Sequence, residues 1–537
     1  MNHSFDYIIV GSGPAGSILA NRLTQDKLHT ACVIEAGIPD TSMYIRIPAG
    51  FVKTLYDPSF LWSYETEPSD SINGRSINLP QGKLVGGSSS INGLVYSRGQ
   101  PEDFDDWAQM GNVGWAYKDI LPYFKRTEKR VGPADENVRG RNGELPITNP
   151  DWKSKLCESY IQGAMDHGIP RNQDFNGVVH DGVGYFQRYI YKGKRVSCAD
   201  AFLHPAIKRG GVELQVNARV QKILFEETRA VGVRYLQDGV IHDVMANKEV
   251  IICAGTLNSP QILQHSGIGD STDLQALGIP VTHHLPGVGK NLRDHFTVRL
   301  VARAKNAASI NELSRGWRLG IEISKWLLGL PSILALSPSM VHVCWKSKPE
   351  LTRGDIQVLF TPASYKSGKN YELDDFPGMS CGVRQQRPNS SGTLRLRSAN
   401  VNDTPIIQPN YLTDEVDQQV MVAGIKIARE LMASASLAPH FHSELVPGSH
   451  CMSDEALLDF ARTRGSTSYH LVGTCKMGTT NDSMAVVDSQ LRVYGIQNLR
   501  VVDASVMPQV PSANTLAATT MVAEKAADMI KGKLHYS

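Results

Sequence analysis

The sequence predicts an α/β protein, α+β overall, with one domain on a Rossmann-like parallel sheet and a second domain on an antiparallel sheet. Three observations lead to this prediction. A short apolar run at residues 7–10 passes directly into a glycine-rich turn and then a helical pattern, which is typical of a strand and crossover helix in a parallel sheet. Residues 355–363, 378–388 and 392–398 look like antiparallel strands, with apolar and polar residues alternating in the last two. The chain of 537 residues is also longer than a single core usually supports.

Composition and charge are those of an ordinary globular protein and argue against nucleic-acid-binding and disulfide-rich classes. Hydrophobic residues make up 41% of the chain and charged residues 20%, which is ordinary for a globular protein. A formal net charge of +2 gives no electrostatic reason to expect a nucleic-acid partner. The eight cysteines are scattered and include no C-x-x-C pair, which suits a reducing compartment. We therefore expect neither nucleic-acid binding nor a disulfide framework.

The chain has no evident targeting segment. Its first six residues lead into a predicted strand and leave no room for a cleavable leader, so we expect a cytoplasmic protein. The most apolar stretch, residues 317–336, is interrupted by Glu322, Lys325 and Pro331 and falls short of a membrane-spanning helix. This stretch favours a buried or lid helix, and a peripheral contact at the inner face of the membrane is the alternative.

The turn at residues 11–16 reads G-S-G-P-A-G and has the spacing of a nucleotide-binding motif. In such a turn Gly11 allows the tight bend, Gly13 lets the backbone approach a pyrophosphate, and Gly16 packs the helix close to the strand. The phosphates then lie at the helix N-terminus, where free N–H groups and the helix dipole favour anions.

A second predicted strand ends in Glu35, nineteen residues after Gly16. A carboxylate at this distance can accept hydrogen bonds from both ribose hydroxyls of an adenosine. Strand, glycine turn, helix and acid together predict a dinucleotide site, but they do not distinguish NAD from FAD.

Three later segments extend the pattern. Residues 82–105 contain two adjacent glycines and three serines, which leave little side-chain bulk and offer donors to a polar or planar ligand. Residues 255–269 follow an apolar strand and look like another strand-to-helix crossover. Near the end of the chain a strand ends in Asp503, and a helix begins near Ser512 or Asn514.

Together these motifs resemble those of the glucose-methanol-choline (GMC) oxidoreductases, the flavoprotein family of choline dehydrogenases and alcohol oxidases. The resemblance covers the whole length of the chain and implies FAD as the cofactor. The residues that match the first family signature are Gly82, Lys83, Val85, Gly86, Gly87, Ser88, Ser89, Ile91, Asn92, Tyr96, Gly99 and Asp105. Those that match the second signature include Ser259, Pro260, Ser266, Gly267, Ile268 and Gly269.

The resemblance also implies where FAD binds. The adenosine is expected on the front motif and near Val220, the isoalloxazine near Asn92, and the ribityl and pyrophosphate end at Asp503 and Ala504. Some members attach FAD through a histidine in the GGSSSIN motif; Ile91 stands at that position here, so we expect non-covalent FAD. The expected cofactor-binding residues are Gly11, Gly13, Pro14, Ala15, Gly16, Glu35, Ala36, Gly82, Val85, Gly87, Ser88, Asn92, Gly93, Leu94, Val95, Val220, Ala254, Asp503, Ala504, Asn514 and Thr515.

The segment SYHLVGTCKMG, residues 468–478, contains one histidine, His470. Taken alone, a histidine among such neighbours favours core packing. His470 resembles the family's catalytic histidine in its H-x-x-G-T context, which takes the hydroxyl proton of an alcohol. The family's second catalytic position falls on Asn514, whose amide can donate to the substrate oxygen. Leu471 is a departure, because many relatives have proline there.

Family architecture implies a discontinuous FAD-binding domain and an inserted substrate-binding domain. The FAD-binding domain is expected at residues 1–155, 200–300 and 466–537. The substrate-binding domain is expected at residues 156–199 and 301–465.

The substrate is expected to be a neutral primary alcohol. Choline-oxidising relatives hold the trimethylammonium group with a glutamate at the position of Met340, and no acidic residue occurs from Ser332 to Lys348. A cationic substrate would therefore be desolvated without compensation. The apolar run at residues 333–345 favours a fairly hydrophobic alcohol.

The expected reaction is FAD-dependent oxidation of this alcohol to the aldehyde, with proton abstraction by His470 and hydride transfer to flavin N5. A dehydrogenase that uses a quinone or redox protein is favoured, because GTCKMG and VVDASVMPQ look most like dehydrogenase members of the family. An oxidase that uses O₂ and releases H₂O₂ is the alternative, and a hydroxynitrile lyase of the same family is a third reading. No metal is expected, because the histidines have no partners at metal spacing.

Overall fold

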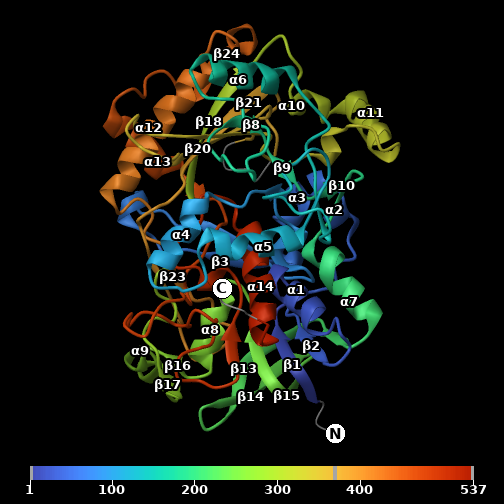
Figure 1. The fold of residues 1–537 in the computed structure, drawn as a ribbon. Helices are drawn as coiled ribbons and strands as arrows, with labels where there is room; N and C mark the ends of the chain where they lie inside the picture. Colours follow the sequence, from blue (N-terminus) through green and yellow to red (C-terminus); the bar gives the residue numbers. More distant parts are fainter. Residues whose placement is uncertain (1–3, 367–371, 534–537) are drawn as a thin grey trace.

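The computed structural model describes residues 4–366 and 372–533 and has two lobes, each built around a seven-stranded sheet (Figure 1). The lower lobe in the figure contains a sheet of strand order β12-β2-β1-β15-β14-β13, with β26 beside β15; we call it the mixed sheet. The upper lobe contains a sheet of order β24-β18-β21-β20-β19-β8, with β25 beside β18; we call it the antiparallel sheet. The predicted fold class is confirmed.

The mixed sheet joins distant parts of the chain. Its parallel strands are β1 (Ser4–Val10), β2 (Ala31–Ile34), β12 (Val212–Gln215), β15 (Val240–Ile252) and β26 (Leu499–Val501). The long strand β15 continues into an antiparallel ladder with β14 (Arg229–Gln237) and β13 (Ala218–Glu226). The apolar run at residues 7–10 is therefore a central strand, as predicted, because it is paired on both sides.

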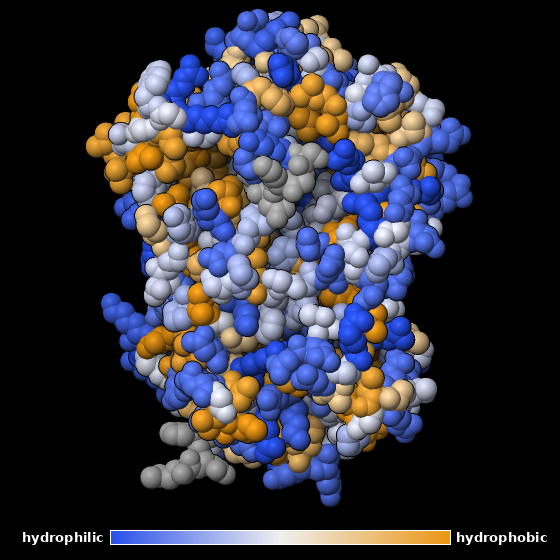
Figure 2. All heavy atoms as spheres, turned by 180° about the vertical axis from the view of Figure 1, so that it is seen from behind, coloured by the Kyte–Doolittle hydropathy of each residue, from blue (hydrophilic) through white to orange (hydrophobic). Residues whose placement is uncertain are grey.

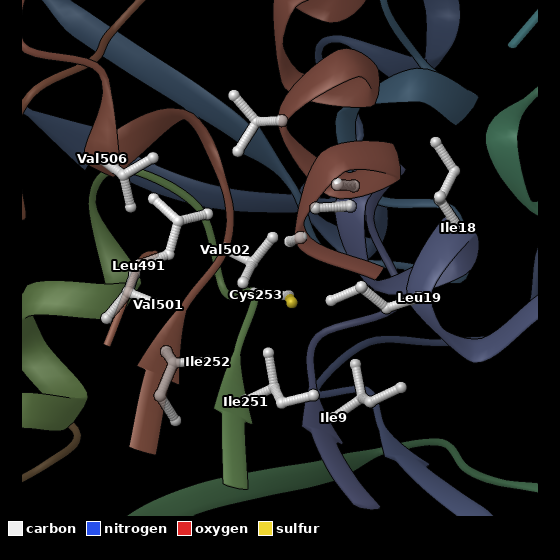
Figure 3. Close-up of a cluster of buried hydrophobic side chains, with 14 of the residues drawn as sticks. Ile9, Ile18, Leu19, Ile251, Ile252, Cys253, Leu491, Val501, Val502 and Val506 are labelled. Atoms are coloured by element: carbon white, nitrogen blue, oxygen red, sulfur yellow. The ribbon is translucent and has the colours of Figure 1, made fainter. Parts of the chain in front are cut away.

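Helices α1 (Pro14–Leu23) and α14 (Thr515–Ile530) pack against each other and against this sheet. Figure 3 shows the shared core, in which Ile9, Leu19 and Ile251 meet side chains from the C-terminal segment. These three side chains are fully buried. Close packing of both chain ends holds the glycine turn beside the start of α14.

The antiparallel sheet contains β8 (Gly182–Tyr185), β18 (Phe296–Ala304), β19 (Val341–Trp345), β20 (Ile356–Thr361), β21 (Gly378–Gln385), β24 (Phe441–Val446) and β25 (Ser466–Thr467). Helices α6 (Lys155–Asp166) and α12 (Glu415–Met432) contact its central strands, and α13 (Asp454–Arg464) packs on α12. Two of the three predicted strands belong to this sheet. The third, at residues 392–398, is β22 (Thr393–Arg395), which instead pairs with β23 (Ile406–Gln408) in a separate ladder.

The remaining elements are short and connect or cover the two sheets. The helices are α2 (Met43–Arg46), α3 (Phe51–Thr54), α4 (Pro101–Gln109), α5 (Tyr117–Thr127), α7 (His204–Arg209), α8 (Asn258–His265), α9 (Ser271–Ala276) and α10 (Ile310–Leu313). The small ladders are β3 (Leu61–Glu65) with β4 (Asn78–Gly82), β5 (Val95–Tyr96) with β9 (Gln187–Arg188), β6 (Glu128–Arg130) with β7 (Leu145–Ile147), β10 (Ile190–Tyr191) with β11 (Lys194–Arg195), and β16 (Ile268–Gly269) with β17 (His283–His284).

The predicted domain boundaries can be compared with sheet membership. Strand β18 crosses the boundary at residue 300 and belongs to the antiparallel sheet along its whole length. Strand β25, at the beginning of the range 466–537, pairs with it. The boundaries themselves stay a prediction.

Helix α11 (Gly316–Leu327) projects from the upper lobe, at the upper right of Figure 1. Of the predicted buried or lid helix, burial is wrong, because Trp317 is 73% exposed and Leu328, just beyond the helix, is 75% exposed. A lid role stays a prediction. Hydrophobic atoms gather over this helix at the upper left of the rear view in Figure 2. In the part of the chain that the structure describes, no helix has the length and apolarity needed to span a membrane.

A buried ion cluster ties together three segments of the chain around residues 98, 128 and 139. Glu128 accepts hydrogen bonds from Nε of Arg98 at 2.7 Å and from Nε of Arg139 at 3.0 Å. All three side chains are almost completely buried. Burial raises the pKa of Glu128, but the two guanidinium groups outweigh that effect and hold the pKa below its usual value.

We predict that Glu128→Gln destabilises the fold by about 3–5 kcal/mol, because it leaves two buried guanidinium groups without their shared carboxylate. Urea unfolding of the FAD-free protein measures the change. Asp243→Asn is the matched control, since its ion pair with Arg234 lies on the exposed β14–β15 hairpin, and its effect should be much smaller. Equal losses of unfolding free energy in the two variants would contradict the stabilising role given to the Glu128 cluster.

Candidate active site

A large cavity lies between the two lobes and is lined by residues of both sheets. It encloses about 2420 Å³ of empty space, its mouth to solvent included. One end lies against the glycine turn of residues 11–16, and the other against strands β18, β20 and β21. The antiparallel sheet therefore presents to the cavity the face that α6 and α12 leave open.

The three glycines of the front turn have different roles. Gly11 has φ +103°, and a Cβ there would lie 2.5 Å from the carbonyl oxygen of Cys253. A Cβ on Gly16 would lie 1.9 Å from the carbonyl oxygen of Gly11, so this glycine allows α1 to pack against the turn. A Cβ on Gly13 meets nothing within 4 Å, and Gly13 lines the cavity. The geometry agrees with a backbone that approaches a bulky anion at Gly13.

Glu35 presents an oriented carboxylate to the cavity. Its Oε2 accepts hydrogen bonds from the backbone N–H and the hydroxyl of Ser12, at 3.0 and 2.7 Å, and its Oε1 accepts from the Gly37 N–H at 2.8 Å. Burial raises its pKa, and these three donors oppose that effect. A fixed acceptor beside open space fits the hydroxyl donors of a ribose. The sequence did not predict Ser12 as a site residue, because Ser12 acts indirectly, by orienting the Glu35 carboxylate.

Most predicted cofactor-binding residues line the cavity, together with His470. They are Gly11, Gly13, Pro14, Ala15, Glu35, Ala36, Gly82, Gly87, Ser88, Asn92, Gly93, Leu94, Val95, Val220, Ala254, Asp503, Ala504, Asn514 and Thr515. Gly16 and Val85 do not line it. Gly16 packs α1 on the turn, and Val85 is 1% exposed and donates its N–H to the carbonyl of Ile38. Both shape the loops around the cavity instead of facing it.

Asp503 fixes the loop that crosses the cavity floor. Its Oδ2 accepts hydrogen bonds from the Gly255 N–H at 2.9 Å and the Ser259 hydroxyl at 2.5 Å, and Oδ1 accepts from the Ser505 N–H at 2.8 Å. Burial raises the pKa of Asp503, and these donors lower it. This carboxylate therefore ties the C-terminal segment to the second signature region.

At the substrate end, His470 makes contacts through both ring nitrogens. Its Nε2 lies 2.9 Å from Nδ2 of Asn514, and its Nδ1 lies 3.0 Å from Nδ1 of His295. Its backbone N–H donates to Asp294 at 2.8 Å. Asn514 is the N-cap residue of α14, yet its side chain makes no capping bond and reaches His470 instead. The structure thus brings the two predicted catalytic residues together.

The hydrogen-bond partners of His295 fix the position of its own proton. A carbonyl oxygen only accepts, so Nε2 of His295, 2.7 Å from the Gln386 oxygen, must donate. Burial and Arg384 lower the pKa of His295 well below 6.5, so the ring is neutral and its Nδ1 is a bare acceptor. Nδ1 of His470 therefore faces an acceptor, Nδ1 of His295, and a donor, Nη1 of Arg384, each at 3.0 Å. Nε2 of His470 faces the Asn514 amide.

His470 is also kept neutral by its surroundings. Burial lowers its pKa well below 6.5, and Arg384 and His295 lower it further. The guanidinium Nη1 of Arg384 lies 3.0 Å from Nδ1 of His470. A neutral imidazole with a bare Nε2 facing a cavity can accept a proton from a bound hydroxyl group.

Sequence reasoning missed Asp294, His295, Arg299 and Arg384. Asp294 and His295 stand side by side just before strand β18, in the segment NLRDHF. An Asp-His pair at a strand end was an available signal, but no local spacing links residue 295 to residue 470. Contact between them depends on tertiary packing.

The basis for expecting a hydrophobic substrate is not supported. Met340 is 1% exposed and packs in the core of the upper lobe with Val341 and Val343. Of the run at residues 333–345, only Pro338 and Ser339 line the cavity. The run is apolar because it forms core, and it carries no information on the substrate.

Among the described residues, one group of potential metal ligands lies outside the cavity lining: Asp40, Asp200 and His204. Nε2 of His204 lies 2.9 Å from the Asp40 carboxylate, and an ordinary hydrogen bond accounts for this proximity.

The family model described as GMC oxidoreductase matches residues 5–297, and a second model with the same description matches residues 388–523. The chain belongs to the GMC oxidoreductase family. It is therefore an FAD-dependent oxidoreductase that acts on CH–OH donors. The glycine cradle and the oriented Glu35 carboxylate fit this cofactor.

GMC relatives of known name align over almost the whole chain. Mitochondrial choline dehydrogenase of Mus musculus is 39% identical over 539 residues, covering 98% of this chain and 89% of that protein. Alcohol dehydrogenase (acceptor) of Pseudomonas putida is 40% identical over 537 residues, covering 99% and 96%. Among solved structures, pyridoxine 4-oxidase from Mesorbium loti has a TM-score of 0.89 at 29% identity, covering 99% and 100%. Formate oxidase, with a TM-score of 0.92 at 23% identity, shows the fold alone.

We predict that Gly13→Ala weakens FAD binding by about tenfold or more while leaving the FAD-free fold intact. The added methyl group meets no protein atom within 4 Å, and φ of −62° suits alanine. It projects into the space that the GMC cofactor needs, and overpacking there costs about 1–3 kcal/mol. Fluorescence titration of FAD-free protein measures the affinity. Gly320→Ala, in open space on α11 and outside the cavity, is the control. Unchanged affinity in Gly13→Ala would contradict the assignment.

Proposed function

We propose that this protein oxidises a primary alcohol to the aldehyde, with His470 as the base and Asn514 as the donor to the substrate oxygen. The observation that carries the proposal is the 2.9 Å contact between Nε2 of His470 and the Asn514 side chain, both residues lining the cavity. The proposal assigns the proton of His470 to Nδ1, toward His295, which leaves Nε2 as the base. FAD, when bound, supplies the acceptor for the hydride that leaves the carbinol carbon.

Each residue of the pair has one task. In the structure Nδ2 of Asn514 lies 2.9 Å from Nε2 of His470, and a bound substrate hydroxyl takes the place of this contact, donating to Nε2 of His470 and accepting from Nδ2 of Asn514. His470 then takes the hydroxyl proton, while the Asn514 amide stabilises the negative charge that develops on the oxygen. The hydrogen bond to His295 keeps the ring of His470 in the orientation that both tasks need.

FAD binding is proposed to be non-covalent and to use the predicted residues that line the cavity. Ile91, at the attachment position of some relatives, has a hydrocarbon side chain and is 2% exposed. It packs with Ile45, Phe60 and Leu84 and offers no atom for a covalent link. The front glycines and Glu35 are proposed to hold the adenosine diphosphate part, and Asn92, Ala504 and Thr515 the flavin part.

The electron acceptor is proposed to be a quinone or redox protein. The support is that GMC relatives of about 40% identity are named dehydrogenases, including the alcohol dehydrogenase (acceptor) of Pseudomonas putida. An oxidase is the second candidate, favoured by the likeness to pyridoxine 4-oxidase. A hydroxynitrile lyase has no observation in its favour here.

Choline is not the proposed substrate, although several relatives are choline dehydrogenases. Among the described residues that line the cavity, the acidic ones are Glu35 and Asp503, and both are engaged by backbone and serine donors. At the substrate end no carboxylate faces a trimethylammonium group, so its desolvation would be uncompensated.

A cytoplasmic location with a peripheral membrane contact is retained as a proposal. Helix α11 supports the contact, because Trp317, Leu327 and Leu328 are more than 70% exposed. The neighbouring cations Arg315 and Lys325 are paired with Asp375 and Glu322, so the support comes from the apolar residues alone.

We predict that His470→Ala lowers the rate of flavin reduction by alcohols about 10²–10⁴-fold while FAD stays bound. Anaerobic stopped-flow absorbance with benzyl alcohol, a medium-chain alkanol and a short polyether measures the rate. Readmitting air to the reduced wild type separates the two acceptors, since rapid reoxidation with H₂O₂ indicates an oxidase. Wild-type flavin that no alcohol reduces would contradict the proposed reaction.

The pH dependence follows from the lowered pKa of His470. The base acts when neutral, so activity is lost as the pH falls through that pKa, and we predict no loss between pH 7 and pH 6. Arg384→Met removes a charge that lowers the pKa, so the acid limb should move to higher pH. The pH profile of the flavin reduction rate measures both effects. An acid limb that does not move would contradict the role given to Arg384.

A further inference from the structure

One face of the antiparallel sheet forms the wall of the cavity at the substrate end. The lining residues alternate along each strand, as side chains on one face of a sheet must. They are Thr297 and Arg299 on β18, Leu359 and Thr361 on β20, and Ser380, Gly382 and Arg384 on β21. Arg384 pairs directly opposite Thr297, and Arg299 lies opposite Gly382.

The charges on this wall have one sign. Of its described lining residues, the charged ones are Arg299 and Arg384. The acidic lining residues Glu35 and Asp503 belong to the mixed-sheet lobe. Two neighbouring guanidinium groups without a facing acid make a positive subsite in a partly dehydrated wall.

Arg384 has donors that the protein does not satisfy. The residue is 2% exposed, and its Nε has no hydrogen-bond partner among the described residues. Its Nη1 lies 3.0 Å from Nδ1 of His470. Its Nη2 lies 3.5 Å from Oδ1 of Asn514, at the limit of a hydrogen bond.

The acid that influences Arg384 is Asp294, and its oxygens are already engaged. It accepts hydrogen bonds from the Tyr411 hydroxyl at 2.6 Å, from the Thr467 hydroxyl and from the backbone N–H of His470. It makes no ion pair with Arg384 within residues 4–366 and 372–533. Burial lowers the pKa of Arg384 to about 9, against the opposing effect of Asp294.

Arg299 occupies the outer part of the same wall. It is exposed, and its guanidinium lies over the ring of Tyr365, 5.2 Å from the centroid. Gly382, opposite it, has no side chain, and the atom nearest to an added Cβ is 3.6 Å away. An added Cβ there would make ordinary contacts with Leu359 and Thr297, so no bulky side chain stands at this position of the wall.

We propose that the alcohol substrate carries a carboxylate, which Arg384 binds beside the reaction centre and Arg299 assists from the outer strand. The substrate class is thus a hydroxycarboxylate with a primary alcohol group, in place of the neutral alcohol expected from the sequence. This inference rests on the proposed function. A planar carboxylate suits the fork of donors on a guanidinium, which recognises it through paired charge-assisted hydrogen bonds.

The subsite also links binding to base strength. A bound carboxylate offsets the Arg384 charge that lowers the pKa of His470, so the base becomes stronger when the correct substrate is present. The reaction itself balances as for any alcohol. The hydroxyl proton goes to His470, the carbinol hydride carries two electrons to FAD, and the carboxylate leaves unchanged on the aldehyde product.

The first test compares glycolate, 3-hydroxypropanoate and 4-hydroxybutanoate with the matching diols, which carry a hydroxymethyl group in place of the carboxylate. In anaerobic flavin reduction, the best acid should exceed its diol about tenfold or more in the second-order rate constant. Arg299→Gln should lower that ratio severalfold. Arg303→Gln is the matched control, since Arg303 lies on the same strand outside the cavity and should leave the ratio unchanged.

A second measurement does not depend on turnover. Propanoate, titrated into the oxidised holoenzyme and followed by flavin absorbance, should bind more weakly in Arg299→Gln and Arg384→Gln than in the wild type. Ratios near one for all three pairs, or propanoate binding that neither substitution weakens, would overturn the subsite while alcohol oxidation stands. If neither acids nor diols reduce the flavin but both arginines control propanoate binding, the subsite stands and the proposed oxidation fails.

Discussion

The hydrogen bond between Nδ1 of His295 and Nδ1 of His470 is the contact on which the site depends. One ring stands just before strand β18, and the other lies on the C-terminal segment that leads to α14. The Gln386 carbonyl fixes the proton of His295, and we propose that the bare Nδ1 of His295 in turn accepts the proton on Nδ1 of His470. A buried chain of this kind gives one arrangement of donors and acceptors, because any break would leave a polar group unpaired. It joins the segments that flank the paired strands β18 and β25, where the chemistry is proposed.

Packing around this chain explains why the catalytic pair can be so far apart in sequence. The core shared by β1, β15, α1 and α14 fixes the start of α14, and with it Asn514. The Asp294 side chain accepts from the backbone of His470 and so fixes the loop from the other side. Side chains in close-packed surroundings lose little further entropy when substrate binds, which favours a preorganised site.

The local parts of the fold could be predicted from the sequence, because short-range spacing determines them. The strand, glycine turn and helix at the front follow from period and backbone chemistry, and so does the helix that begins after Asn514. His470 and Asn514 were found through the family motifs. The contact of His470 with His295 could not be predicted, since 175 residues separate them and only the packed sheets bring them together.

Most of the wrong predictions from the sequence concerned which residues are buried and which face the cavity. Gly16 and Val85 belong to the motifs but pack loops instead of facing the cavity, and the run around Met340 is core. Helix α11 was expected to be a buried or lid helix, and it exposes its tryptophan. Alternation along β18 and β21 indicates which residues share a face, yet it does not indicate which face meets the cavity, so Arg299 and Arg384 emerged only from the packed structure.

The most direct test of the central claim is neutron diffraction from crystals of the deuterium-exchanged, oxidised holoenzyme near neutral pH. We predict a deuteron on Nδ1 of His470, directed at a bare Nδ1 of His295, and none on Nε2 of His470. A deuteron on Nε2 of His470 would contradict it, because the ring would then have no free lone pair toward the cavity.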